Sequence, residues 1–159
     1  MPQQPPFKKV SIILSKATIE NVYAAIVLAH GARSEGIDVN LFFTFFGLEA
    51  VTKKRMKDLH VATVGNPAMH LPSLLGIMPG MEQVATAMMQ KQMAAIDVPS
   101  IPEFLEMVHD EGAKLYACKM TVDMFKLKKE QLWEGVERIV TVGEFYQLAG
   151  GEHTQIIFI

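Results

Sequence analysis

Short runs of apolar residues alternate along the chain with segments in which apolar residues recur at every third or fourth position. Residues 8–15 contain the first run, and apolar residues at helical spacing follow from Ile19 to Val27. A second run, rich in phenylalanine, covers residues 39–46 and stops at Gly47. Nearly continuous apolar strands that are separated by a helix are typical of a parallel sheet with both faces covered. The pattern therefore predicts an α/β fold with residues 39–46 as a central strand.

The middle of the chain interrupts this alternation. A short helix is predicted over residues 48–57, and a Met- and Pro-rich insertion follows at about residues 59–99, with a helix over residues 80–96. The alternation resumes with a helix over residues 101–111, which Ser100 would cap. The remaining elements complete a mostly parallel sheet of five strands: strands over residues 114–118, 138–142 and 154–159, and short helices over residues 121–127 and 143–149.

Composition favours a folded protein that associates with itself. The 159 residues suit a single α/β domain over residues 1–159, of which the insertion is a part. Hydrophobic residues make up 50% of the chain and charged residues 20%, which disfavours disorder and leaves little polar surface. We therefore expect a homo-oligomer, with a trimer as the size to test.

Charge and hydropathy disfavour two classes of partner. The net charge of −2 offers no basic field that would attract a nucleic acid. No apolar run approaches the roughly 20 residues that cross a bilayer, so no integral membrane segment is expected. The proline-rich start lacks the pattern of a signal peptide, and we expect a cytoplasmic protein.

The single cysteine, Cys118, is the strongest candidate nucleophile in the sequence. It ends a predicted strand and opens a helix, at the sheet edge where parallel α/β proteins bind ligands. The first amides of the helix and the neighbouring Lys119 would both favour a thiolate, so we expect a partly exposed thiol with a lowered pKa. The alternative stays open, because a lone cysteine at a strand end is often part of the core.

Hydroxyl groups gather at the other strand ends, whereas assignable general bases do not. The supporting or binding residues that this arrangement nominates are Ser15, Thr18, Thr44, Lys119, Met120 and Thr121. The histidines at positions 30, 60, 70, 109 and 153 are scattered, which weakens hydrolase chemistry and offers no plausible metal site. Glycine-rich phosphate-binding patterns are missing, so no cofactor is expected. Peroxiredoxins carry a threonine three residues before their reactive cysteine, and Leu115 occupies that place here.

Four segments carry a resemblance to a known family. Residues 39–48, Val-Asn-Leu-Phe-Phe-Thr-Phe-Phe-Gly-Leu, and residues 116–124, Tyr-Ala-Cys-Lys-Met-Thr-Val-Asp-Met, resemble the DsrE/DsrF/DrsH-like family, as do residues 134–136 and 142–145. The resemblance spans nearly the whole chain. It implies a three-layer, flavodoxin-like (DsrE-like) fold, oligomers, and a cysteine after a central strand that carries persulfide sulfur in sulfur-relay proteins. Cys118 matches that cysteine.

The resemblance also implies a function. It suggests a sulfur carrier or sulfurtransferase that holds sulfane sulfur on Cys118, as a persulfide or thiosulfonate, for transfer between protein partners such as a TusA-like carrier. The alternative is a non-catalytic oligomeric module that binds a small ligand or a protein partner in the crevice at the strand ends. Exposure of Cys118 discriminates between the two hypotheses.

Overall fold

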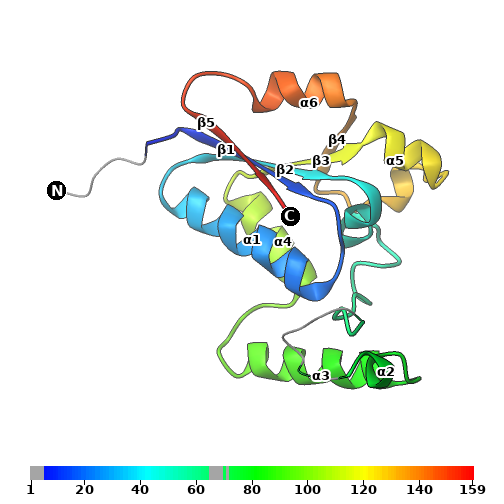
Figure 1. Ribbon diagram of the computed structural model, residues 1–159. Helices are drawn as coiled ribbons and strands as arrows, with labels where there is room; N and C mark the ends of the chain where they lie inside the picture. Colours follow the sequence, from blue (N-terminus) through cyan, green and yellow to red (C-terminus); the bar gives the residue numbers. More distant parts are fainter. Residues whose placement is uncertain (1–5, 65–69, 71) are drawn as a thin grey trace.

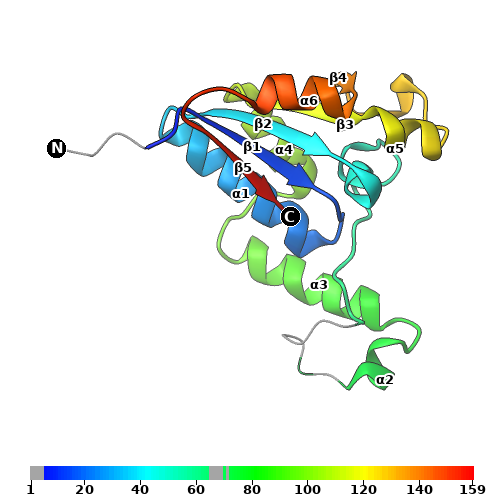
Figure 2. The same cartoon turned by 45° about the horizontal axis from the view of Figure 1, so that its top comes forward.

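The computed structural model describes residues 6–64, 70 and 72–159 (Figures 1 and 2). Its centre is a five-stranded sheet in the order β4-β3-β2-β1-β5. Every neighbouring pair of strands is parallel, as the apolar runs of the sequence predict. The strands are β1 (Lys9–Leu14), β2 (Asp38–Phe43), β3 (Lys114–Cys118), β4 (Val136–Val140) and β5 (Thr154–Phe158).

Helices cover both faces of the sheet and complete three layers. The helices α1 (Ile19–Ser34) and α4 (Ile101–Asp110) lie together on one face, and α6 (Val142–Ala149) lies on the other (Figure 2). The short helix α5 (Lys119–Met124) follows β3 directly at its carboxyl end. A short 3₁₀-helix, η3 (Lys129–Gln131), lies between α5 and β4. The α/β, flavodoxin-like architecture expected from the sequence is confirmed.

Side chains alternate between two buried clusters, one on each face of the sheet. Leu115 and Ala117 of β3 belong to the larger cluster, which packs against α1 and α4. Tyr116 and Cys118 point the other way and join a smaller cluster with Phe145 of α6. Successive residues of a strand face opposite sides, so a strand that is covered on both sides must be apolar throughout.

The chain after β2 departs from the predicted pattern. The strand expected over residues 39–46 ends at Phe43, and a 3₁₀-helix, η1 (Phe45–Val51), replaces the α-helix expected over residues 48–57. The amide of Gly47 donates to the Ser15 carbonyl at 3.0 Å, and a Cβ at Gly47 would collide with the carbonyl of Leu14. This close approach to the end of β1 makes the chain turn before the apolar run is finished.

Strand β4 also lies earlier than predicted, at Val136–Val140 instead of residues 138–142. Thr141 caps α6 in a reciprocal arrangement with Glu144, whose carboxylate accepts from the Thr141 amide at 2.7 Å. A helix cap at this position requires the strand to end before it.

The insertion forms two helices that stand away from the sheet in both views (Figures 1 and 2). They are α2 (Ser73–Gly76) and α3 (Met81–Ala94), the second close to the helix predicted over residues 80–96. Parts of the insertion, including Pro67, lie outside the described residues. Among the helices that are described, none combines the length and the apolar character needed to cross a membrane.

Candidate functional site

Cys118 is the last residue of β3, as the sequence predicts, and the N-cap of α5, which spans Lys119–Met124 instead of the predicted residues 121–127. An N-cap residue has an extended backbone, and its side chain faces the first free amides of the helix. The backbone amides of Met120 and Thr121 favour the thiolate of Cys118, although its side chain closes no capping hydrogen bond of ordinary geometry. The thiol therefore occupies the cap position without binding the helix amides as a serine or aspartate oxygen does.

Two buried hydroxyl groups complete the surroundings of the sulfur. Thr44 directly follows β2, which is the neighbour of β3, and Thr121 lies in the first turn of α5. Their Oγ1 atoms are 3.3 Å apart, and both hydroxyls favour the thiolate of Cys118. Two amides and two hydroxyls thus influence the acidity of one sulfur atom.

These contacts set the acidity of the thiol. Burial raises the pKa of Cys118, because a thiolate loses the stabilising effect of water. The hydrogen bonds from Thr44, Thr121 and Met120 favour the thiolate and outweigh burial, so the pKa lies below its ordinary value of 9.0. The direction agrees with the sequence-based expectation.

The expected role of Lys119 in this acidity is wrong. Its Nζ lies 2.6 Å from Oδ2 of Asp123, one helical turn further along α5, and both side chains are exposed. An i,i+4 pair on the outer face of a helix keeps the ammonium group in water. The hydrogen bonds within the fold, and not the lysine, account for the lowered pKa.

The expected exposure of Cys118 is also wrong, since the residue is only 1% exposed. Its cluster contains Phe42 from β2, Val140 from β4 and Phe145 from α6. The rings of Phe42 and Phe145 stack with their centroids 4.4 Å apart. The neighbouring strands and α6 together cover the sulfur, which a reading of β3 alone does not reveal.

The other nominated residues divide into two groups. Thr44, Thr121 and the amide of Met120 meet at the sulfur, whereas the side chain of Met120 is exposed. Ser15 donates its hydroxyl to the carbonyl of Ile159 at 3.0 Å. Thr18 is the N-cap of α1, and its hydroxyl accepts from Nδ2 of Asn21 at 2.8 Å. Ser15 and Thr18 therefore serve local structure at a neighbouring strand end.

The sequence did not predict one group near the sulfur, the backbone amide of Phe45. The amide of Phe45 donates to Oγ1 of Thr121 at 2.9 Å, which ties the turn after β2 to the first turn of α5. Phe45 has a φ of 45°, in the left-handed region. The sequence places Phe45 inside an apolar run, and a backbone amide carries no side-chain signal that would have identified it.

Comparison with known proteins identifies the family of this chain. Residues 6–157 match the profile of the DsrE/DsrF/DrsH-like family. The chain belongs to this family. It is 37% identical over 151 residues to a protein of Allochromatium vinosum named sulfur carrier protein DsrE2. The aligned region covers 90% of this chain and 93% of that protein. It is also 25% identical over 135 residues to the uncharacterized protein YrkE of Bacillus subtilis, covering 82% and 84% of the two chains.

Solved structures share the fold of this DsrE-like protein. MTH1491 from Methanobacterium thermoautotrophicum, a protein of unknown function, superposes with a TM-score of 0.56 at 13% identity, covering 95% of this chain and 98% of that one. The YchN protein of E. coli gives a TM-score of 0.53 at 16% identity, covering 96% and 99% of the two chains. At these identities the likeness concerns the fold.

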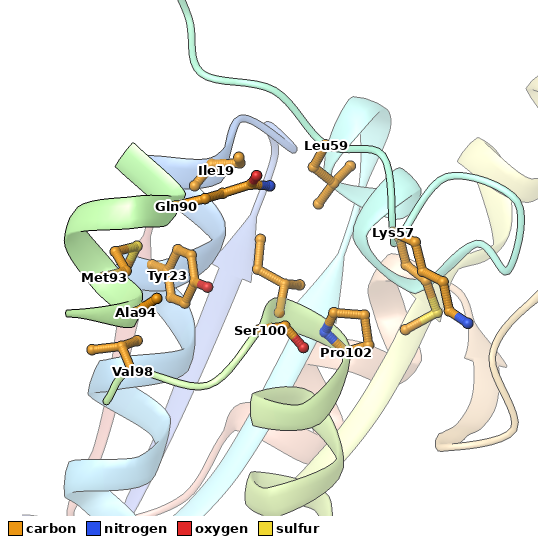
Figure 3. Close-up of a pocket in the computed structure, with 12 residues that line it drawn as sticks. Ile19, Tyr23, Lys57, Leu59, Gln90, Met93, Ala94, Val98, Ser100 and Pro102 are labelled. Carbon is orange, nitrogen blue, oxygen red and sulfur yellow. The ribbon is translucent and has the colours of Figure 1, made fainter. Parts of the chain in front are cut away.

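Two cavities of the DsrE-like chain lie beside the sheet without reaching Cys118. One, of about 430 Å³, opens at the carboxyl end of β1 and is lined by residues 16–18, Phe46 and His60 among others. The second, of about 320 Å³, lies on the α1 and α4 face, where Tyr23, Gln90 and Met93 surround it (Figure 3). Neither lining contains the cysteine, so the thiol and these spaces are separate features.

Metal chemistry has no visible centre in the described part of the chain. Among those residues no group of three or more His, Cys, Asp or Glu side chains is arranged to hold a metal ion. His70 is exposed and belongs to no helix or strand.

Proposed function

We propose that this DsrE-like protein is a sulfur carrier, in which Cys118 receives sulfane sulfur from a donor and passes it to an acceptor protein. The observation that carries the proposal is a buried thiol at the junction of β3 and α5 whose pKa is lowered by the Thr44 and Thr121 hydroxyls and the first amides of α5. A carrier needs a nucleophilic thiolate and little proton-transfer machinery beyond it. The A. vinosum relative that is named a sulfur carrier protein supports the same conclusion.

The transfer step balances without an external oxidant or reductant. The Cys118 thiolate attacks the terminal sulfur of a donor persulfide, the donor S–S bond breaks, and the donor leaves as a thiolate. The new S–S bond leaves a persulfide on Cys118, whose terminal sulfur an acceptor thiolate then removes in the same way. A TusA-like carrier protein supplies suitable chemistry as donor or acceptor, and a thiosulfonate is the alternative cargo on the same atom.

Burial of the thiol adds a requirement to this function. A sulfur that is 1% exposed must become accessible before a protein donor can reach it. Local opening of a covering element supplies such access without global unfolding. Helix α6 contributes Phe145 to the buried cluster that contains Cys118.

The same burial favours a second candidate function. A non-catalytic module that binds a small ligand or a partner would keep Cys118 as a core residue and use the crevice at the strand ends instead. The cavity of about 430 Å³ at the carboxyl end of β1 has a suitable size and carries both charges, from Lys16, Arg55 and Glu49.

Mass spectrometry after treatment with a sulfane-sulfur donor separates the two functions. We expect the wild type to gain one sulfur atom that dithiothreitol removes, and the Cys118→Ser variant to gain none. Alkylation of the unfolded wild type provides the control that the thiol is free. If Cys118 resists both loading and alkylation in the folded protein, the binding module replaces the carrier.

The organisation of the molecule is part of the proposal. Residues 1–159 act as one DsrE-like domain, and the region of about 59–99 is an insertion within it. We also place the protein in the cytoplasm, where thiols remain reduced and a lone cysteine stays available for sulfur transfer.

A further inference from the structure

The turn after β2 contains a residue in an unfavourable backbone conformation. Phe45 has a φ of 45°, where a bulky side chain is rarely found. Its amide donates to Oγ1 of Thr121 at 2.9 Å, across 76 positions of sequence. A conformation of this kind persists because the surrounding contacts hold it, and here it aims an amide at the residue beside Cys118.

Thr121 is the meeting point of these contacts. It is fully buried, and its Oγ1 lies between the Phe45 amide and Oγ1 of Thr44, the latter 3.3 Å away. A hydroxyl has one proton to donate and two lone pairs to accept with. Because the amide of Phe45 occupies one lone pair, the proton of Thr121 remains for the sulfur or for Thr44.

The protonation state of Cys118 decides between these two partners. A thiol can donate its own proton to one of the hydroxyls, whereas a thiolate only accepts. When the sulfur ionises, both hydroxyl protons can turn toward it by rotation alone. The pair Thr44 and Thr121 can therefore accommodate either state without moving a heavy atom.

We propose that Thr121 is a positioning residue for the reaction of Cys118. The Phe45 amide fixes the Oγ1 atom of Thr121, and the Thr121 hydroxyl is then oriented to donate a hydrogen bond to the sulfur. The inference rests on the proposed carrier function and adds to it a group that favours the thiolate of Cys118. The same hydroxyl is available to a persulfide anion, because charged acceptors form the stronger hydrogen bonds.

Ultraviolet absorbance of the thiolate tests this assignment directly, because the chain has a single cysteine and the measurement needs no access to it. Thr121→Val should lower the thiolate-to-thiol ratio about tenfold, the size of one pKa unit, and Thr121→Ser should restore it. The Cys118→Ser protein, titrated in each background, subtracts the absorbance of tyrosinate. The rate of sulfur loading should fall with Thr121→Val and recover with Thr121→Ser.

Thr86→Val is the matched control. Thr86 is 7% exposed and its hydroxyl accepts from the Val61 amide at 3.0 Å, so the substitution removes a similar buried contact elsewhere in the fold. We expect it to leave the titration of Cys118 unchanged. An equal shift in both valine variants would mean general loosening of the fold and overturns the proposal, as does an unshifted titration in Thr121→Val.

A measurement on the unmodified protein covers the case in which Thr121→Val does not fold. The amide resonance of Phe45 should titrate together with Cys118 in the wild type and remain constant in Cys118→Ser, because the Thr121 hydroxyl reorients on ionisation. A resonance that does not follow the thiol overturns the inference. If the shifts occur as expected but the wild type takes up no sulfur, the positioning role holds and the carrier function fails.

Discussion

At the scale of single residues, the decisive feature is a sulfur atom in the position of a helix cap. The free amides at the start of α5 exist in any helix, but β3 must end at Cys118 for the thiol to face them. The lysine beside it contributes no such effect, since Asp123 holds it on the outer surface. Short-range hydrogen bonds therefore outweigh the nearest formal charge in the sequence.

The acidity of Cys118 predicts a pH dependence of stability. Burial raises its pKa, but the hydrogen bonds from Thr44, Thr121 and Met120 bring it below the ordinary 9.0. Between the lowered pKa of the folded protein and the ordinary pKa of the unfolded chain, the unfolded chain binds more protons than the folded one. The free energy of unfolding therefore rises with pH in this range. The wild type should gain free energy of unfolding relative to Cys118→Ser as the pH rises toward 9, and lose this gain as the pH falls through the folded pKa.

Urea unfolding of both proteins across this pH range measures the effect. Serine preserves the shape of the cap and does not titrate, so all other groups cancel in the difference. A difference between the two proteins that stays constant with pH would show that Cys118 has an ordinary pKa in the folded state.

At the scale of elements, α6 contributes to the burial of Cys118, which the sequence of the helix does not indicate. It covers the face of the sheet on which the sulfur lies, with Phe145 stacked on Phe42. The helix is short, and its start depends on the reciprocal cap between Thr141 and Glu144. A short element with one strong cap is a plausible place for the opening that sulfur transfer requires.

Removal of that cap should make Cys118 more reactive. Thr141→Ala lowers stability by about 1 kcal/mol, the usual cost of losing a threonine cap. If this loss of stability is confined to α6, the population of molecules in which α6 is locally unfolded rises about fivefold. Alkylation of Cys118 then accelerates by the same factor. The measurement is the rate of thiol alkylation under native conditions.

Ser100→Ala supplies the matched control on the other face. Ser100 caps α4, and the carboxylate of Glu103 accepts from its amide at 3.0 Å and from its hydroxyl at 2.6 Å. We expect a comparable loss of stability without faster alkylation. Equal acceleration in both variants would show that Cys118 reacts through global unfolding.

At the scale of the whole molecule, many large apolar side chains are exposed, and two groups of them lie on α3 and on the edge strand β5. Helix α3 and the residues around it expose large side chains, among them Met88 and Ile96. Strand β5 lies at the edge of the sheet and exposes Phe158, which is 70% accessible. Apolar surface of this kind and an open parallel edge both favour contact with another chain.

We therefore expect a homo-oligomer in solution, and a trimer remains the size to test. Light scattering at micromolar concentration measures the mass, and a stable monomer contradicts the prediction. Met88→Lys and Phe158→Lys place a charge on each surface in turn. The variant that reduces the mass identifies which surface is buried between subunits.

The sequence by itself determined the parallel α/β architecture and the position of Cys118 between a strand and a helix. Both follow from local signals: apolar runs bounded by turns, and apolar residues at helical spacing. Residues 114–118 became β3 with the predicted bounds, because a short apolar run between a glycine turn and a helix start has few alternatives. The DsrE-like motif around Cys118 also lies within one continuous stretch.

Only the tertiary structure decided what surrounds the sulfur. Thr44, Phe45 and Phe145 come from three separate elements, and their distances to one another depend on the order of the strands and the path of the connections. After the early end of β2, Gly47 approaches the end of β1 so closely that a Cβ would collide with the carbonyl of Leu14, and no local pattern contains this contact. Exposure is likewise a property of all neighbours together, so a thiol expected at the surface proved to be buried beneath α6.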